Sequence, residues 1–254
     1  MNKIPILGVL INSTSYAGST KEILSWAEDH KSGYVCAANV HMLMEAYDSR
    51  EFMKVVNSAD LVTPDGMPLV WMLRAKGIKG QERVYGPTLM LHVLESAARD
   101  GIPVGFYGSS HVVLDELVKK MKLKFPGLNV GYSYSPPFRE LTVAEDQVIC
   151  EKIINSAARI LFVGLGCPKQ EIWMAHHREK INTIMVGVGA AFDFHAGLKA
   201  QAPAWMQAVG LEWLFRLLHE PRRLARRYLY NNPRFVLLAL LDLMGILKGG
   251  NKEA

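Results

Sequence analysis

The chain has 254 residues, of which 50% are hydrophobic and 21% are charged, and its formal net charge is +5. This composition is sufficient for a substantial core and excludes a chain that is mainly disordered. The three cysteines lie far apart in the sequence, which excludes a disulfide-rich scaffold and a cysteine-based zinc motif and fits a reducing cytoplasm.

Strand-like and helix-like segments alternate along most of the chain. Strands are expected at residues 6–11, 34–38, 60–63, 103–107, 128–132, 160–163 and 183–188. Helices are expected at residues 20–30, 40–58, 67–76, 87–99, 111–124, 143–158 and 168–179. This alternation predicts an α/β fold, with a Rossmann-like, mostly parallel sheet and helices on both of its faces.

The sequence changes character after Gly197, where strand-like segments stop. Residues 200–254 are predicted to form a helical appendage on a catalytic core of residues 1–199, with helix breaks at Pro221 and at residues 231–233. The longest apolar stretch of the appendage, residues 235–247, contains Asp242 and is shorter than the roughly 20 residues that span a bilayer. The chain also begins without the layout of a signal peptide, so we expect neither a leader nor a membrane-spanning helix.

Arginines are concentrated in this appendage, with only Glu220 opposing them over the same stretch. Such a cluster attracts polyanions, namely the phosphates of a ligand, anionic lipid headgroups or nucleic acid. A tryptophan beside an arginine, as at Trp213 and Arg216, suits a membrane interface. The cluster consists of Arg216, Arg222, Arg223, Arg226, Arg227 and Arg234.

A carboxylate, Asp65, stands at the end of the predicted strand 60–63, between Pro64 and Gly66. In an open α/β sheet, ligands bind at the carboxyl ends of strands, where a strand passes into a helix. Asp65 is therefore a candidate catalytic residue that faces a substrate hydroxyl. The alternative is a turn or N-cap aspartate, which the sequence Pro-Asp-Gly also favours.

Two glycine turns follow predicted strands and carry the candidate substrate-binding residues Gly164, Gly166, Gly187 and Gly189. Glycines let backbone amides approach a phosphate at a helix N-terminus. Neither turn completes the GxGxxG fingerprint, because Lys169 and Phe192 occupy the third glycine position. This argues against a dinucleotide cofactor and leaves a nucleotide of another kind open.

Three polar side chains are further candidates for substrate binding. Asn39 directly follows the strand 34–38 and either caps the next helix or presents its amide at the same sheet edge as Asp65. Gln170 lies in the first turn of a helix, where it either is solvated or bonds a sugar or nucleotide hydroxyl. Arg83 lies in a loop, where an exposed charge is the simpler interpretation.

Metal-dependent and serine-hydrolase chemistry lack their motifs in this sequence. His176 and His177 have no third ligand at a useful spacing, and no Asp-x-Asp occurs, Asp193-Phe194-His195 being the nearest approach. No Gly-x-Ser-x-Gly elbow occurs. We therefore predict no metal and no cofactor.

Several motifs together resemble the WecG/TagA/CpsF family of bacterial glycosyltransferases, glycosyltransferase family 26, over residues 12–235. The appendage segment from Glu212 to Arg227 also resembles the C-terminal part of that family. The most specific motifs are Asn39-Val40-His41, Leu61-Val62-Thr63-Pro64-Asp65-Gly66, Glu82-Arg83-Val84-Tyr85-Gly86, Val163-Gly164-Leu165-Gly166-Cys167-Pro168-Lys169-Gln170-Glu171 and Gly187-Val188-Gly189-Ala190.

The resemblance implies an inverting, metal-independent transferase that is peripheral on the cytoplasmic face of the membrane. Its donor would be a UDP-sugar, such as UDP-N-acetylmannosamine or a related UDP-hexose, and its acceptor an undecaprenyl-diphosphate-linked sugar. Exopolysaccharide, capsule, enterobacterial-type antigen and teichoic-acid linkage are the products that this family serves. Nucleic acid is not among the implied partners, and a neighbouring copy of the chain could take the part of the appendage in closing the site.

The resemblance also assigns roles to residues of this chain. Asp65 matches the general base, and Arg83 and Gln170 match family site residues. Members often carry Thr shortly before the asparagine of the strand end, whereas this chain has Ala37-Ala38-Asn39, so that a hydroxyl is missing near the sugar. The diphosphate-binding arginines match Arg216, Arg223 and Arg226, with Arg222 and Arg227 as alternatives in register.

Two other functions compete with this interpretation. One is a Rossmann-type oxidoreductase, which the incomplete glycine fingerprints disfavour. The other is a non-catalytic adaptor that binds a membrane or nucleic acid through the arginine cluster. An adaptor leaves the strand-end residues Asn39, Asp65 and Gln170 without a role, which favours the transferase.

Overall fold

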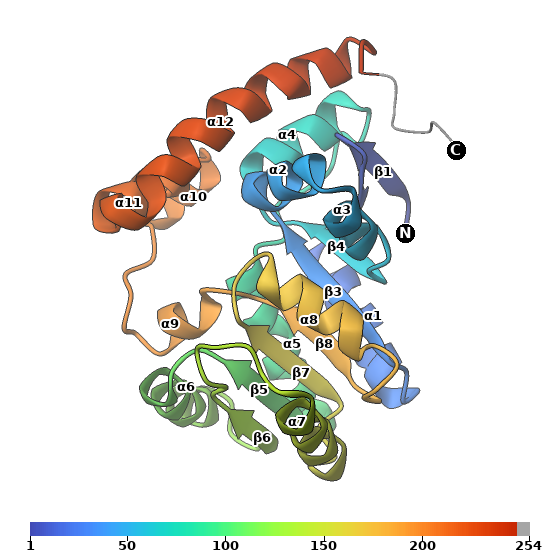
Figure 1. The fold of residues 1–254 in the computed structure, drawn as a ribbon, viewed down its shortest axis with the longest axis vertical. Coiled ribbons are helices and arrows are strands. Elements are labelled where there is room, and N and C mark those ends of the chain that lie inside the picture. Colours follow the sequence, from blue (N-terminus) through green and yellow to red (C-terminus); the bar gives the residue numbers. More distant parts are fainter. Residues whose placement is uncertain (248–254) are drawn as a thin grey trace.

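The computed structural model describes residues 1–247 and shows an α/β protein built around one central sheet (Figure 1). Six parallel strands form this sheet in the order β4-β3-β8-β7-β5-β6. Two short antiparallel strands, β1 and β2, form a separate hairpin. The predicted fold class is confirmed. The strands are β1 (Lys3–Ile6), β2 (Val9–Asn12), β3 (Gly33–Ala38), β4 (Leu61–Pro64), β5 (Val104–Gly108), β6 (Val130–Tyr134), β7 (Ile160–Gly164) and β8 (Ile184–Gly187).

Helices cover both faces of the sheet and continue beyond it at the C-terminal end. The helices over the core are α1 (Tyr16–Glu28), α2 (Val40–Asp48), α3 (Arg50–Asn57), α4 (Met67–Ala75), α5 (Gly86–Asp100), α6 (His111–Lys124), α7 (Val143–Asn155), α8 (Lys169–His177) and α9 (Ala191–His195). The later helices are α10 (Ala204–Ala208), α11 (Glu212–His219) and α12 (Pro221–Leu243).

Two sequence predictions in the N-terminal half are corrected. The strand expected at 6–11 is a hairpin, because Leu7 and Gly8 both have positive φ values, 50° and 87°, and reverse the chain. The helix expected at 40–58 is two helices. Ser49 has an extended backbone, and its side chain accepts a hydrogen bond from the amide of Phe52, which begins α3.

Two hydrophobic clusters lie on opposite faces of the sheet. One packs α2, α3, α7 and α8 against the sheet and reaches α4 and the β1–β2 hairpin. The other packs α1, α5, α6 and α9 against the opposite face. The strands between them are almost entirely apolar, as parallel strands covered on both sides are. Because the six strands are parallel, their carboxyl ends all lie at one edge of the sheet.

The C-terminal helices differ from the sequence prediction in one respect. The break expected at residues 231–233 does not occur, because α12 continues through Pro233. Phe235 and Ala239 on this helix are buried in the first hydrophobic cluster. Their packing outweighs the hydrogen bond that proline removes. In Figure 1, α12 crosses the top of the molecule over α2 and α4.

No helix in the described part of the chain, residues 1–247, combines the length and the apolar character that a membrane span requires.

Candidate active site

The strand ends bring the predicted site residues to one edge of the sheet. Asn39 follows β3, Asp65 follows β4, and the two glycine turns follow β7 and β8, the next strands along the sheet. The turn at Asp65 is fixed to its neighbour, since the amides of Asp65 and Gly66 both donate to the carbonyl of Ala38, at 2.9 and 3.2 Å. The Asp65 carboxyl group therefore leaves the sheet from a rigid turn.

Of the two alternatives for Asp65, a turn residue or an N-cap, the N-cap is excluded because its side chain does not cap helix α4. Gly66 is the N-cap of α4, and no side chain makes the capping hydrogen bond. Gly66 has φ of −85°, so the conformational freedom of glycine is not used here. Instead, Asp65 Oδ1 accepts a hydrogen bond from Arg83 Nη2 at 3.2 Å, and Arg83 Nε also bonds the Asp65 carbonyl.

A second carboxylate, Glu212 at the start of α11, shares this arginine. Arg83 Nη2 lies 2.6 Å from Glu212 Oε2, and the Tyr85 hydroxyl donates to Glu212 Oε1 at 3.0 Å. The Arg83 guanidinium also lies over the Tyr85 ring, 4.0 Å from its centroid. The C-terminal helices are thus bound directly to the residues around Asp65.

The protonation of Asp65 is set by its surroundings. Burial raises the pKa of Asp65 to about 7; Arg83 opposes this shift, and Glu212 adds to it. The side chain is nevertheless 14% exposed, so it can meet a ligand. A carboxyl group with a pKa near neutrality can take up a proton during a reaction, as a general base must.

Gln170 and Asn39 serve the protein's own backbone in this structure. Gln170 is 4% exposed, and its Oε1 accepts hydrogen bonds from the amides of Gly166 and Gly189, at 3.2 and 3.1 Å. Its side chain therefore joins the turns after β7 and β8. Asn39 Oδ1 accepts from the amides of His41 and Met42 and caps α2. Direct substrate contacts of these two side chains stay predictions.

The glycines allow close packing around these turns. A Cβ atom on Gly164 would lie 2.6 Å from the ring of Phe192, and one on Gly187 would lie 2.7 Å from Met174 Cε. Gly166 has φ of 82° and takes a left-handed turn that glycine favours. Because the amides of Gly166 and Gly189 already donate to Gln170, phosphate binding by these turns also stays a prediction.

Two cavities meet at Asp65. The first, of about 430 Å³, is lined by both glycine turns, Ala37, Asp193 and Lys199. The second, of about 770 Å³, extends between α4 and α12 and is lined mainly by apolar side chains. Asn39, Asp65, Tyr85, Arg216 and Arg227 line both cavities.

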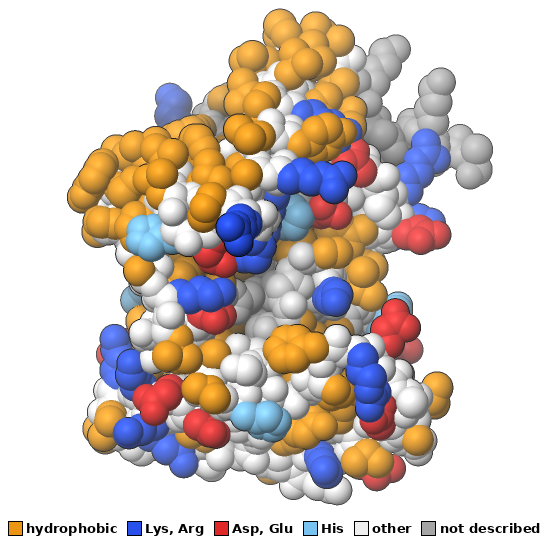
Figure 2. All heavy atoms as spheres, turned by 60° about the vertical axis from the view of Figure 1, so that its left-hand side comes forward, with side chains coloured by type: hydrophobic (Ala, Val, Ile, Leu, Met, Phe, Trp, Pro, Cys, Tyr) orange, Lys and Arg blue, Asp and Glu red, His pale blue; other side chains and the backbone are white. Residues whose placement is uncertain are grey.

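Only some of the arginines in the C-terminal helices line these cavities. Arg216 and Arg227 line both cavities, and Arg223, which is paired with Glu220 at 2.6 Å, lines the polar one. Arg226 is exposed and lines neither cavity, whereas Arg227, its alternative in register, lines both. Diphosphate binding by these arginines stays a prediction. Arg223 and Arg227 are four residues apart, so both lie on the side of α12 that lines the polar cavity. Arg222 is also exposed and outside both cavities. Figure 2 shows basic side chains around a hollow below the hydrophobic upper part of the molecule.

A buried polar group under the cavities was missed in the sequence. Glu171 is fully buried; burial raises its pKa to about 7, and its Oε1 accepts from Gln170 Nε2 at 2.7 Å. Arg227 Nε is buried without a hydrogen-bond partner, and burial lowers the pKa of this arginine. Glu171, Tyr85 and Glu212 all belong to the quoted motifs, but the sequence alone gave no sign that they contact the other site residues.

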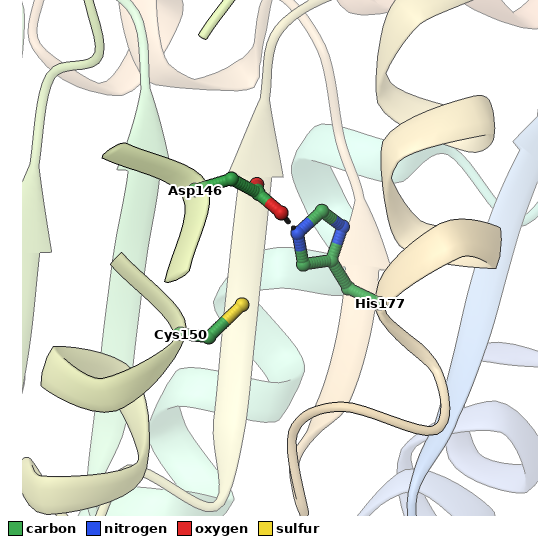
Figure 3. A group of neighbouring side chains, drawn as sticks. All are labelled: Asp146, Cys150 and His177. Carbon is green, nitrogen blue, oxygen red and sulfur yellow. Dashed lines mark hydrogen bonds and ion pairs between the residues drawn. The ribbon is translucent and has the colours of Figure 1, made fainter. Parts of the chain in front are cut away.

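Another polar cluster lies away from this edge and fastens α7 to α8. His177 Nε2 bonds Asp146 Oδ1 at 2.8 Å, its Nδ1 bonds the Trp173 carbonyl at 2.7 Å, and Cys150 lies beside them (Figure 3). The second carboxylate oxygen of Asp146 pairs with Lys180 at 3.2 Å. The oxygens of Asp146 and both nitrogens of His177 therefore have partners, which gives this hydrogen-bonded cluster a structural role. The prediction that the chain uses no metal remains a prediction.

An acidic residue at the junction of a polar and an apolar cavity, at the strand ends of an α/β sheet, is suited to an enzyme that joins two unlike substrates. Comparison with known proteins identifies the class of enzyme. The chain belongs to the Glycosyl transferase WecG/TagA/CpsF family, whose model matches residues 4–248. It is therefore a glycosyltransferase, and the resemblance found in the sequence is confirmed.

One relative of known activity is similar over most of its length. The chain is 30% identical over 217 residues to the N-acetylglucosaminyldiphosphoundecaprenol N-acetyl-beta-D-mannosaminyltransferase of Bacillus spizizenii. The match covers 85% of this chain and 82% of the relative.

Proposed function

We propose that this protein transfers N-acetylmannosamine, or a related hexose, from a UDP-sugar to an undecaprenyl-diphosphate-linked N-acetylglucosamine, with inversion at the anomeric carbon. The name of the Bacillus relative supports the acceptor and the transferred sugar. The observation that carries the mechanism is the position of Asp65, at the junction of the polar and the apolar cavity.

In this mechanism the polar cavity receives the nucleotide sugar and the apolar cavity receives the lipid-linked acceptor. Asp65 takes the proton of the attacking acceptor hydroxyl as its oxygen forms the new bond to the anomeric carbon. The bond from that carbon to the UDP oxygen breaks, and UDP leaves with the electron pair. A positioned base of this kind contributes roughly 10²–10⁴-fold to the rate.

Arginines supply the positive charge that the leaving diphosphate requires. Arg216 and Arg227 line both cavities, and Arg223 lines the polar one. Guanidinium groups match phosphate oxygens with two parallel hydrogen bonds, and such contacts strengthen as charge develops on the leaving group. On this basis we propose that the reaction proceeds without a metal ion.

We further propose that the enzyme is peripheral on the cytoplasmic face of the membrane. Residues 200–254 form the membrane-associating appendage in this proposal, on a catalytic core of residues 1–199. Supporting side chains on α12 are exposed and apolar, among them Leu229, Val236, Leu240 and Leu243. The last seven residues of this predicted appendage, 248–254, lie outside the described residues.

The test is release of UDP from a panel of UDP-sugars in EDTA, with and without a polyprenyl-diphosphate N-acetylglucosamine acceptor. We expect acceptor-dependent release from one donor. Asp65→Asn is expected to retain donor binding and lose roughly 10²–10⁴-fold in kcat. Turnover of Asp65→Asn at the rate of the unmodified enzyme would remove Asp65 as the base, and no release from any donor would favour the adaptor.

A further inference from the structure

The larger cavity has an apolar part that the chemistry at Asp65 does not explain. This part is a groove between α4 and α12. One wall comes from α4 and the other from α12, and the groove continues from the Asp65 end to the end of both helices. Its lining includes Trp71, Met72, Ala75, Val236, Leu240 and Leu243.

The groove is open at the surface. Trp71 is 48% exposed and Leu240 is 53% exposed, although both side chains are large and apolar. Exposed apolar side chains that line a concave surface are typical of a binding site. Lys76 and Asp242 form an ion pair at 2.9 Å that ties the end of α4 to α12, so the two walls are joined there.

The polar end of the same cavity determines which kind of molecule fits. Asp65, Arg216 and Arg227 line that end, and the apolar side chains line the rest. One continuous cavity thus offers cationic groups and then an apolar groove. This order matches a molecule with a sugar, an anionic diphosphate and a hydrocarbon chain, in that sequence.

We propose that the groove between α4 and α12 binds the first isoprene units of the acceptor's polyprenyl chain. The proposal rests on the proposed function. The diphosphate at Arg216 and Arg227 places the first carbons of the chain at the groove entrance, and the remaining units continue past Leu243 into the bilayer. A lipid that is held in this way places its sugar at a fixed position beside Asp65.

Two neighbouring residues on α12 provide a matched pair of variants. Leu240 lines the groove, whereas Leu237 is 60% exposed and does not line the cavity. Leu240→Glu places a charge in the groove, and Leu237→Glu makes the same change outside it. Both side chains are exposed, so both variants are expected to fold. Ala75→Trp, on the opposite wall, narrows the groove without adding charge.

The experiment compares two soluble acceptors, N-acetylglucosamine diphosphate carrying either a farnesyl or a methyl group, in buffer without detergent or vesicles. We expect the unmodified enzyme to favour the farnesyl acceptor in kcat/KM by about ten-fold or more. Leu240→Glu and Ala75→Trp are expected to reduce that ratio about ten-fold, and Leu237→Glu is expected to keep it. Equal kcat/KM for both acceptors, or an equal loss in Leu237→Glu, would overturn the proposal.

A second measurement separates the groove from the reaction. A benzophenone-bearing farnesyl diphosphate is photo-crosslinked to the protein, and the labelled peptides are identified. Labelling of α4 and α12 that Leu240→Glu abolishes and Leu237→Glu retains supports the groove even if no acceptor turns over, in which case the proposed function alone fails. Labelling elsewhere, or labelling that Leu240→Glu leaves unchanged, refutes the groove.

Discussion

Replacing Glu212 with glutamine tests whether the C-terminal helices tune the base. The variant retains a side chain that can hydrogen-bond Arg83 and Tyr85 but removes one negative charge near Asp65. Both carboxylates contact Arg83 Nη2, so their oxygens lie no more than about 6 Å apart. At an effective dielectric constant of about 20, two charges at this distance repel by about 3 kcal/mol, or about two pKa units.

The expected result is a shift of the pH profile toward acid. Asp65 must be deprotonated to act as a base, so kcat/KM rises with pH through its pKa, which is about 7. Glu212 raises that pKa, and its neutralisation therefore lowers it. We expect the acid limb of Glu212→Gln to move down by about one to two pH units, because solvent reaches both groups and weakens their repulsion.

The assay is UDP release at subsaturating donor and acceptor, which reports kcat/KM, between about pH 5 and pH 9. Glu82→Gln is the matched control, because Glu82 precedes Arg83 in the chain but is exposed and is not among the groups that shift the pKa of Asp65. An acid limb that stays in place or moves upward in Glu212→Gln would refute the reasoning. An equal shift in Glu82→Gln would do the same.

Three further changes test the surrounding structure. Burial raises the pKa of Glu171 from 4.5 to about 7, so the stability that its protonated form gives is lost as pH rises through that range. Glutamine cannot ionise, so Glu171→Gln is expected to raise the free energy of unfolding by roughly 3 kcal/mol above pH 8 and hardly at all below about pH 4.5. Urea titrations at both pH values measure this difference. An equal gain at both pH values would contradict this assignment. Gly164→Ala is expected to lower the urea midpoint through a loss of about 1–3 kcal/mol, because its Cβ would lie 2.6 Å from Phe192, whereas Gly80→Ala, with no atom within 4 Å of its Cβ, serves as the neutral control. Ending the chain after Ala200 is expected to leave a folded core, by circular dichroism, that neither turns over nor sediments with vesicles; full activity would disprove the role of residues 201–254.

The alternation of strands and helices made the fold predictable, because parallel strands that are buried on both faces are almost entirely apolar. The hairpin at Leu7 and Gly8 escaped prediction, since two four-residue strands and one six-residue strand give nearly the same pattern. The continuity of α12 through Pro233 also escaped it. That outcome depends on the packing of Phe235 and Ala239 against residues distant in the sequence.

The candidate site was predictable at the strand ends and less so in the appendage. Asp65 and Asn39 directly follow strands, so the sheet topology alone brings them together. The partnership of Arg83 with Glu212 joins residues 129 positions apart, and no local pattern indicates it. Which of Arg226 and Arg227 faces the cavities depends on the rotation of α12 about its axis. The sequence does not fix that rotation to within one residue.

Arg216 and Arg227 line both cavities, so under the proposed function the two substrates would share these arginines as counter-ions. Each substrate carries a diphosphate, and an arginine that pairs with one has less charge to offer the other. By thermodynamic linkage, occupancy of either cavity must then weaken binding in the other by the same factor. UDP that remains after transfer would therefore hinder the next acceptor as well as the next donor, and a bound acceptor would in turn weaken the binding of that UDP.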